Sequence, residues 1–575
     1  MIGIDGTKVT FTTKTLAAVF TDGVLTELKS IKGEEFISAP ADFGAGSIGG
    51  ASGISGAGGV AGDAGDAYQL VYPGNDAYPL RKRSSVYVQP LNDHSAFICI
   101  DGWYGEGVIK VEEDLETGDL LVTPSVTTKR GGLRAIRFIV NGIREDLRVV
   151  APLYQGVNLA LDDPLLKNSC YRWPIEWDAG LIILQGEKSG FWIHTQDRQY
   201  RYKALRTGLG ADSRALGFDT EAYGPIDHNK CAGGITWRFN VYEGGWQVPA
   251  ERYRSWLFDA YNLHRAAASR PDWLWDINMA ILCFQSDMDI LDALAKKTDP
   301  SKTLLKPVEW RTDKYDQNYP RYIETESAAA FMRKAKDLGF HAMPHMNALQ
   351  IDPLHEDYYK VEGFELPDID TKKIWGWVWD KDFNCLDVPK GATALRNSRE
   401  SNTMVMIHPG LSKWRSMFMH NIKGVISRLD LDCVYIDQTS CIFNNCNCLV
   451  ENTTTAEGMN MLIHQVAALN GGIAVCGENL NEITFQGQSL ATVMLYNGPH
   501  QPMDGVERTG GCDLGNFLFG SLCRTYGGFN PELSTEDARL IMRIYREHGS
   551  FPEFYIRNAE DLRNPYPFLK EALKM

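Results

Sequence analysis

The sequence predicts a multidomain protein of the β plus α/β class, in which an N-terminal antiparallel β-sandwich is followed by a (β/α)8 TIM barrel. Three observations support this prediction: the chain has 575 residues, its first half carries many short apolar runs between turn residues, and its second half alternates strand-like and helix-like segments. Sandwiches and barrels of about 200–300 residues are single domains. We therefore expect a β-sandwich over residues 1–250, a connecting helix over 251–270 and a barrel over 271–575.

The sandwich is predicted from period-two alternation. Polar and apolar residues alternate over residues 7–37, and Asp22-Gly23 and Lys32-Gly33 interrupt them as hairpin signals. Similar short runs recur as far as residue 242. Residues 43–67 are mostly Gly, Ala and Ser, so they have little side chain to bury and we expect an exposed, flexible loop. These glycines are not followed by the GK[ST] sequence that a phosphate-binding loop carries.

The barrel is predicted from a change of period after residue 248. Residues 248–268 have helical spacing, Pro271 ends that helix, and residues 277–284 form a strand-like apolar run. The helix-like and strand-like segments that follow are residues 326–340, 341–347, 412–429, 431–438, 455–472, 473–479, 489–497 and 516–523, before a final helix-rich segment. Repeated strand–helix units over about 300 residues are typical of a parallel barrel.

Two of these strand-like runs end abruptly on a carboxylate. Residues 431–438 read LDCVYIDQ and place Asp437 at the strand end, and residues 473–479 read IAVCGEN and place Glu478 there. Chemistry in such barrels is located where strands end and the following loops begin. Because neighbouring strands lie about 4.8 Å apart, the two acids are expected to face one cleft. The structural alternative is that Asp437 caps a turn and Glu478 pairs with an arginine.

Paired carboxylates suit glycoside hydrolysis, in which one attacks the sugar and the other protonates the leaving oxygen. Glu478 follows a glycine and a largely apolar strand, which favours a raised pKa and the role of the acid. Asp437 is then the nucleophile. Glu482, four positions further on, is the alternative acid.

The order of sandwich, connecting helix AERYRSWL and barrel resembles that of glycoside hydrolases that act on α-linked sugars. An aspartate that ends strand four and a glutamate in GE that ends strand five are similar to the alpha-amylase superfamily and to the endo-alpha-N-acetylgalactosaminidase family. The resemblance implies that Asp437 is the nucleophile and Glu478 the acid/base. One position departs from the amylase pattern, because Tyr435 stands where the amylases carry an arginine two residues before the nucleophile. The resemblance is also compatible with a glycosidase-like group without an assigned activity.

Further residues at the expected strand ends are predicted to contact a sugar. Histidine, asparagine, arginine and aspartate side chains hydrogen-bond hydroxyl groups, and tryptophan faces pack on sugar rings. Core packing is the alternative for each tryptophan, and a structural role is the alternative for each histidine. The predicted substrate-binding residues are Trp310, Arg311, His345, Asn347, Trp379, His408, His500 and Asp504.

The sequence gives no pattern for a metal or cofactor. Cys441, Cys446 and Cys448 lie close together, but their spacing is not a repeated CxxC pair and no fourth ligand is evident. The expected first strand lacks the HxH sequence of paired-metal hydrolases. We therefore expect packed or free thiols, no metal and no cofactor, with a structural zinc at these cysteines as the alternative.

Charge and hydropathy exclude some partners. The net charge is −15, which argues against a nucleic-acid partner, because such binding needs clustered Lys and Arg. No run of eighteen apolar residues occurs, so we expect no membrane span. The first residues lack a signal-peptide pattern and the cysteines are scattered, which favours the cytoplasm, although a trimmed leader would leave the same appearance.

Two functions agree with this sequence. The first is a retaining α-glycosidase that acts on an oligosaccharide or glycoside, and the second is a saccharide-binding or assembly protein that keeps the barrel without turnover. The sequence leaves open the sugar, the linkage, exo or endo action and the oligomeric state.

Overall fold

The computed structural model describes residues 1–39, 67–75, 77–80, 85–102, 104–209, 214–283, 285–378, 403–442, 446–493, 511–527 and 534–573. The chain divides into two compact units, Met1–Trp256 and Leu257–Met575. The Gly-rich segment 43–67, predicted as an exposed loop, lies outside the described residues except for Ala67.

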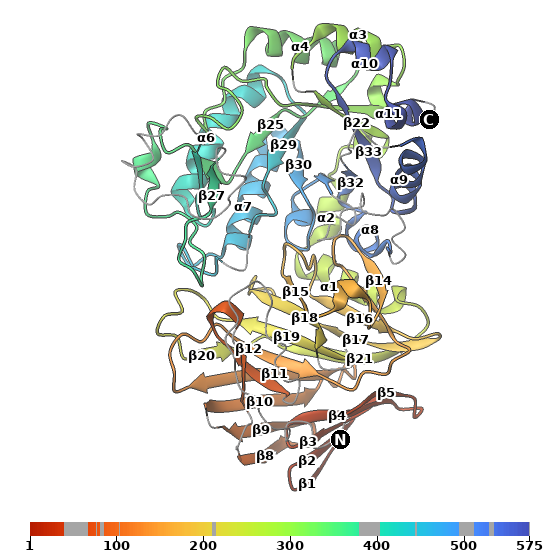
Figure 1. Ribbon diagram of the computed structural model, residues 1–575, viewed down its shortest axis with the longest axis vertical. Helices are drawn as coiled ribbons and strands as arrows, with labels where there is room; N and C mark the ends of the chain where they lie inside the picture. Colours follow the sequence, from red (N-terminus) through yellow and green to blue (C-terminus); the bar gives the residue numbers. More distant parts are fainter. Residues whose placement is uncertain are drawn as a thin grey trace. The chain divides into compact units, whose positions relative to one another are not determined.

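The first unit consists of antiparallel sheets, as its period-two pattern predicts (Figure 1). A five-stranded meander pairs its strands in chain order: β1 (Ile2–Asp5), β2 (Lys8–Thr12), β3 (Leu16–Thr21), β4 (Val24–Ser30) and β5 (Glu35–Ser38). A six-stranded sheet has the order β15 (Ser169–Arg172), β18 (Lys203–Leu209), β19 (Ala215–Glu221), β12 (Ala135–Val140), β6 (Tyr68–Val71) and β7 (Ala77–Pro79).

The largest sheet of this unit has ten strands. Its order is β14 (Val157–Ala160), β13 (Arg148–Ala151), β16 (Leu181–Gln185), β17 (Ser189–His194), β21 (Trp237–Glu243), β11 (Leu120–Thr128), β10 (Gly105–Glu113), β9 (Ser95–Asp101) and β8 (Ser85–Asn92), with β20 (Cys231–Gly233) paired to β11. Buried aromatic side chains fill the core, and the rings of Trp177 and Trp237 stack at 6.4 Å. These sheets agree with the predicted β-sandwich.

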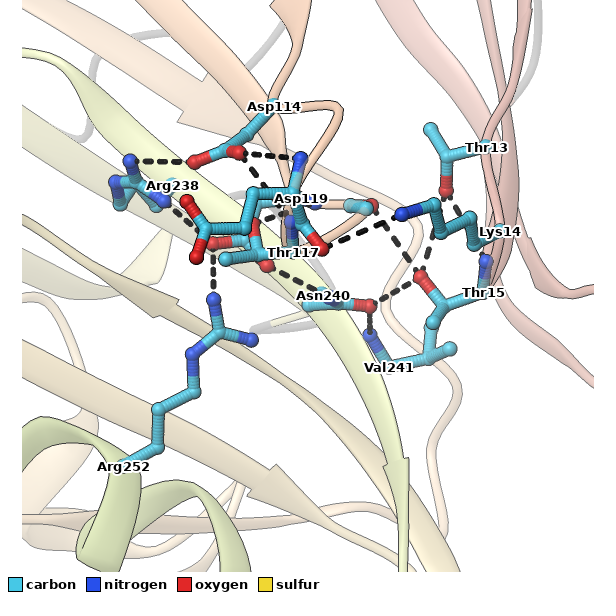
Figure 2. A network of polar contacts seen from close by, with 12 residues as sticks. Thr13, Lys14, Thr15, Asp114, Thr117, Asp119, Arg238, Asn240, Val241 and Arg252 are labelled. Atoms are coloured by element: carbon cyan, nitrogen blue, oxygen red, sulfur yellow. Dashed lines mark hydrogen bonds and ion pairs between the residues drawn. The ribbon is translucent and has the colours of Figure 1, made fainter.

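A buried carboxylate links the meander to the large sheet. Asp119 is fully buried, and its Oδ2 accepts a hydrogen bond of 2.6 Å from Arg238 and another from Arg252. Its Oδ1 accepts from the Asn240 amide at 2.7 Å, and the Asn240 carbonyl oxygen accepts from the Thr15 hydroxyl at 2.7 Å. Figure 2 shows both guanidinium groups directed at the Asp119 carboxylate. Two cations and an amide thus compensate the removal of this carboxylate from water.

The second unit contains a curled parallel sheet of nine described strands, surrounded by helices (Figure 1). Its order is β24 (His341–Ala342), β23 (Thr303–Pro307), β22 (Met279–Cys283), β33 (Phe551–Ile556), β32 (Arg524–Gly527), β31 (Leu490–Thr492), β30 (Ala474–Glu478), β29 (Cys433–Asp437) and β25 (His345–Asn347). A small antiparallel sheet contains β26 (Gln350–Ile351), β28 (Thr403–Met406) and β27 (Gly376–Val378). The parallel sheet is consistent with the predicted barrel.

Most described helices lie between successive strands of the parallel sheet, as expected for strand–helix units. Side-chain hydroxyl groups cap several of them, because the first turn of a helix leaves backbone N–H groups without partners. Thr325 caps the helix that begins at Glu326, and Thr454 caps the one that begins at Thr455. The helices are α1 (Gln247–Ala260), α2 (Leu263–Ala268), α3 (Met288–Ala295), α4 (Glu326–Asp337), α6 (Ser412–Arg428), α7 (Thr455–Ala467), α8 (Leu514–Phe519), α9 (Thr535–Glu547), α10 (Ala559–Arg563) and α11 (Pro567–Ala572).

Alternate residues of the parallel strands share one buried cluster. Its members include Ala280, Leu304, Met343, Cys433, Tyr435, Ala474, Cys476, Leu490, Tyr526 and Phe551. Because side chains alternate between the two faces of a strand, Asp437 and Glu478 lie on the same face as Tyr435 and Cys476. The terminal acids therefore belong to the inner face of the curled sheet.

The structure differs from the sequence-based elements in several places. The predicted helix 248–268 is interrupted between α1 and α2, where Asn262 has a φ of 55°. The apolar run 516–523 forms helix α8 and its C-terminal turn, and the strand follows as β32. An apolar run of this length fits either a buried helix or a strand. Across the described ranges, no helix is both long enough and apolar enough to cross a membrane.

Substituting Asp119 tests the link between the meander and the large sheet. Asp119→Ala leaves two arginines and the Asn240 amide without their shared acceptor, so we expect the free energy of unfolding to fall by roughly 3–5 kcal/mol. Urea unfolding measures this loss. Glu243→Ala is the control, because the Lys32–Glu243 pair is about 70% exposed on both sides and such pairs contribute below about 1 kcal/mol. Equal losses in the two variants would contradict the assignment.

Candidate active site

Strand pairing brings two carboxylates to one edge of the parallel sheet. β29 pairs with β30 from Cys433 and Ala474 to Ile436 and Gly477, and Asp437 and Glu478 are the next residues on the two strands. In each strand the first four residues are buried and the terminal acid is partly exposed. A strand buried on both faces accounts for the continuous apolar sequence of each run. The two acids therefore lie side by side at the carboxyl ends of these strands.

The neighbouring strand β25 orients Asp437. Asn347 is the register partner of Asp437, and its Nδ2 donates a hydrogen bond of 3.2 Å to Asp437 Oδ2. The Asn347 side chain is itself fixed, because its Oδ1 accepts from the backbone N–H groups of Leu349 and Gln350. Nε2 of His345 lies 3.8 Å from the same Asp437 oxygen. This side of Asp437 is thus occupied by an amide and an imidazole.

The chain that follows Asp437 binds Glu478. The backbone N–H of Gln438 donates to Glu478 Oε2 at 3.0 Å. The hydroxyl of Thr439 accepts from the backbone N–H of Glu478 at 2.9 Å and donates to its carbonyl oxygen at 3.0 Å. A Cβ atom at position 477 would collide with side-chain atoms of Thr439 and Gln488, which explains the glycine before the acid. These contacts fix the two strand ends to each other.

The backbone turns immediately after each acid. Gln438 has a φ of 61° and Asn479 a φ of 60°, so both residues adopt the left-handed conformation. Asparagine tolerates this region better than most residues, whereas a longer side chain such as glutamine adopts it at a conformational cost. Strained residues of this kind concentrate at functional sites. At Gln438 the turn directs the backbone N–H toward the carboxylate of Glu478.

Glu478 has a strongly raised pKa. Burial disfavours the charged carboxylate and the nearby negative charge of Asp437 adds to this effect, so the pKa rises from 4.5 to about 8. The positive charge of Lys306 and the N–H of Gln438 act in the opposite direction. Glu478 therefore carries its proton at neutral pH, which suits a group that donates a proton.

Three predicted substrate-binding residues are buried and make hydrogen bonds within the protein. Trp310 is fully buried and its indole N–H donates to the backbone oxygen of His345 at 2.9 Å. Arg311 is buried and its guanidinium group binds backbone oxygens of the 314–321 loop, so its charge is used within the protein. His408 is buried, with Nδ1 accepting from the Gly410 N–H and Nε2 directed at the Cys448 oxygen. Its pKa falls to about 4 because burial disfavours the cation.

The remaining predicted residues are placed as follows. His345 and Asn347 lie beside Asp437, as described above. Trp379, His500 and Asp504 lie outside the described residues. Glu482, the alternative acid, is buried. Cys441, Cys446 and Cys448 form no disulfide bond among the described residues, and within the described ranges no group of three His, Cys, Asp or Glu side chains is arranged to hold a metal ion.

Sequence reasoning missed several residues around the two acids. Gln438 and Thr439 follow Asp437 directly, but their sequence does not show the turn that brings them to Glu478. Tyr435 lies beneath the site, and its ring stacks with that of His345 at 5.5 Å. Lys306 had a signal in the sequence, because a lysine inside the apolar run TLLKP is unusual unless its charge has a use.

The comparisons with known proteins concern family and fold. A domain of unknown function (DUF6259) matches residues 235–459, a region that includes Asp437 and ends before Glu478. No curated protein matches the chain in sequence.

Among solved structures, the alpha-N-acetylgalactosaminidase NagBb from Bifidobacterium bifidum in its GalNAc complex superimposes with a TM-score of 0.65 at 10% identity, over 100% of this chain and 93% of that chain. Its Gal-NHAc-DNJ complex gives 0.64 at 11% identity, over 96% and 88%. The GH36 alpha-galactosidase AgaA from Geobacillus stearothermophilus reaches 0.47 at 9% identity, over 99% and 86%. The likeness to NagBb shows a shared fold.

The raised pKa of Glu478 predicts a pH-dependent stability. Between about pH 4.5 and pH 8 the folded protein retains a proton on Glu478 that the unfolded chain has lost, so stability decreases as the pH rises, by up to about 1.4 kcal/mol per pH unit. Glu478→Gln removes this titration. Urea unfolding at several pH values should show the variant gaining stability relative to the native sequence as the pH rises through this range. Parallel pH dependences in the two proteins would show that Glu478 titrates normally.

Proposed function

We propose that this protein is a glycoside hydrolase that cleaves an α-linked saccharide with retention of configuration, with Asp437 as the nucleophile and Glu478 as the acid/base. One observation carries the proposal: two carboxyl groups lie at one strand edge in different environments. Glu478 holds a proton up to about pH 8, whereas Asp437 accepts an amide hydrogen bond from Asn347. Glycosidases use two carboxyl groups whose environments differ, so that one is protonated and acts as the acid while the other is ionised and acts as the nucleophile.

The proposed reaction has two displacements. The Asp437 carboxylate attacks the anomeric carbon, the bond from that carbon to the leaving oxygen breaks, and the Glu478 proton passes to that oxygen. Glu478 is then a carboxylate and takes a proton from water, whose oxygen bonds to the anomeric carbon as the ester to Asp437 breaks. A retaining enzyme holds its two carboxyl groups about 5–5.5 Å apart, and placement on adjacent strands supports that separation.

The topology supports a barrel with eight strand positions. β24 pairs with β23 at one end of the parallel sheet and β25 pairs with β29 at the other, and only residues 343–344 separate β24 from β25. We infer that β24 and β25 form one interrupted third strand, which closes the sheet and makes residues 271–575 the catalytic domain. The acids then end the fourth and fifth strands, as in the families that the sequence resembles.

Polar atoms near the two acids support a hydroxyl-bearing ligand. Gln350 Nε2, Gln438 Oε1 and Thr492 Oγ1 are buried and have no hydrogen-bond partner among the described residues. Gln350 binds Asn347, Gln438 follows Asp437, and Thr492 is the register partner of Glu478. Buried polar groups normally have partners, and sugar hydroxyl groups both donate and accept. NagBb is named for N-acetylgalactosamine, so aryl α-N-acetylgalactosaminides and α-galactosides are the first substrates to assay.

Replacing the nucleophile is the most direct test. Asp437→Asn is nearly isosteric and retains the Asn347 contact, so we expect an intact fold and a loss of turnover of at least about a thousandfold. Turnover is measured on a panel of aryl α- and β-glycosides, and NMR identifies the anomer released first. Unchanged turnover in the variant would reject Asp437, and an inverted product would reject the double displacement. Saccharide binding by an inactive native protein would identify the saccharide-binding alternative.

Replacing the acid distinguishes the two carboxyl groups. Glu478→Gln should retain much more activity on aryl glycosides with good leaving groups than on alkyl glycosides, because a good leaving group needs little protonation. In the native protein, kcat/KM should decline on the alkaline side with an apparent pKa of about 8, as Glu478 loses its proton. Equal losses for all leaving groups would assign the acid to another residue, and Glu482→Gln is the matched comparison.

A further inference from the structure

A buried lysine lies on the inner face of the sheet, close to the candidate acids. Lys306 is on β23, two residues after Leu304, which belongs to the inner buried cluster, so both side chains point inward. Lys306 is only 7% exposed. Its ammonium nitrogen lies 3.5 Å from the centre of the Tyr435 ring, two residues before Asp437 on β29. A buried cation requires compensating negative charge. The position of Lys306 near the two candidate acids points to an electrostatic role there.

The available counter-ion does not hold this lysine tightly. The nearest Lys306–Glu553 approach is 3.7 Å, to Glu553 Oε1, which is longer than a hydrogen bond. That oxygen has no hydrogen-bond partner within the described part of the chain. Glu553 lies on β33 and is the register partner of Ala280, whereas Lys306 is level with Leu282, two residues nearer the strand ends. Lys306 thus lies between the Glu553 carboxylate and the two acids.

We propose that Lys306 is a positioning residue of this site, whose ammonium group sets the protonation of the Asp437–Glu478 pair from beneath. The inference rests on the proposed function. Asp437 on β29, Lys306 on β23 and the Gln438 N–H act on Glu478. The titratable groups Tyr435 on β29 and Tyr315 in the loop after β23 also face the two acids, and Glu553 lies behind Lys306. Asp437 raises the pKa of Glu478 and Lys306 lowers it, while burial keeps both tyrosines neutral by raising their pKa values.

This arrangement explains how a buried acid remains able to give up its proton. Burial and Asp437 together would keep the Glu478 proton too firmly bound for transfer near neutral pH. A cation at the inner face favours the carboxylate that forms when the proton leaves. Cation–π contact with Tyr435 fixes the ammonium group at a constant place without neutralising its charge. In this proposal Lys306 acts through Glu478 and Asp437.

The test measures the titration of Glu478 without requiring turnover. The infrared band of a protonated carboxyl group is recorded against pH, and the spectra of the matching Glu478→Gln variant are subtracted. In Lys306→Met the midpoint for Glu478 should rise by about one pH unit, because a nearby opposite charge is lost. In Lys306→Arg, which keeps the positive charge, the midpoint should stay close to its native value. A midpoint that stays unchanged in Lys306→Met would overturn the inference.

A double variant separates this role from a structural one. Lys306→Met alone leaves Glu553 buried without a cation and is expected to lose stability, whereas Lys306→Met/Glu553→Gln removes both charges and should regain it. The raised midpoint should persist in the double variant, since of these two residues Lys306 and not Glu553 acts on Glu478. Return of the midpoint to its native value together with the stability would overturn the inference.

The pH profile of kcat/KM distinguishes this inference from the proposed function. If both hold, the alkaline limb moves upward with the infrared midpoint in Lys306→Met. If the midpoint moves and the limb does not, the Lys306 inference stands and Glu478 is not the acid. If neither moves, Lys306 has no influence on the site.

Discussion

The register between β25, β29, β30 and β31 is the constraint on which the candidate site depends. Asn347 is level with Asp437, and Glu478 is level with Thr492, so one row of paired positions carries both acids and two of their polar neighbours. A slip of one residue between β29 and β30 would turn the side chains of one strand to the opposite face. Asp437 and Glu478 would then no longer share a face. The backbone hydrogen bonds of the sheet, which do not depend on side-chain identity, thus fix the relative position of the two acids.

Local contacts convert this register into a defined geometry. The Thr439 hydroxyl joins the backbone at Glu478 through two hydrogen bonds, and the left-handed turn at Gln438 places an N–H on the acid itself. Holding these groups in one conformation costs conformational entropy. The burial of the surrounding strands offsets that cost. A carboxyl group held in this way needs little reorganisation during a reaction, which is the advantage of a preorganised site.

The electrostatics of the site arise from opposing influences on Glu478. Burial and the negative charge of Asp437 raise its pKa, and Lys306 and the Gln438 N–H lower it, with a result near 8. The cation comes from β23, and it lies against the ring of Tyr435, two residues before Asp437 on β29. The Tyr435 ring binds the ammonium group through its face.

The sequence by itself determined the secondary-structure periods and the two terminal acids. Polar–apolar alternation with hairpin signals predicted the antiparallel sheets. Apolar strand-like runs that end on Asp437 and Glu478 predicted the two acids at the strand ends. Both predictions succeed because these patterns are local in the sequence. It did not separate sugar contacts from structural residues. Some predicted contacts have side chains that could bind a sugar, namely Trp310, Arg311 and His408. Only the folded structure shows that these side chains are hydrogen-bonded to backbone groups. Lys306 and Glu478 are far apart in sequence, and only tertiary folding places their charges within mutual influence, since the effect of a charge depends on distance and burial rather than on position along the chain.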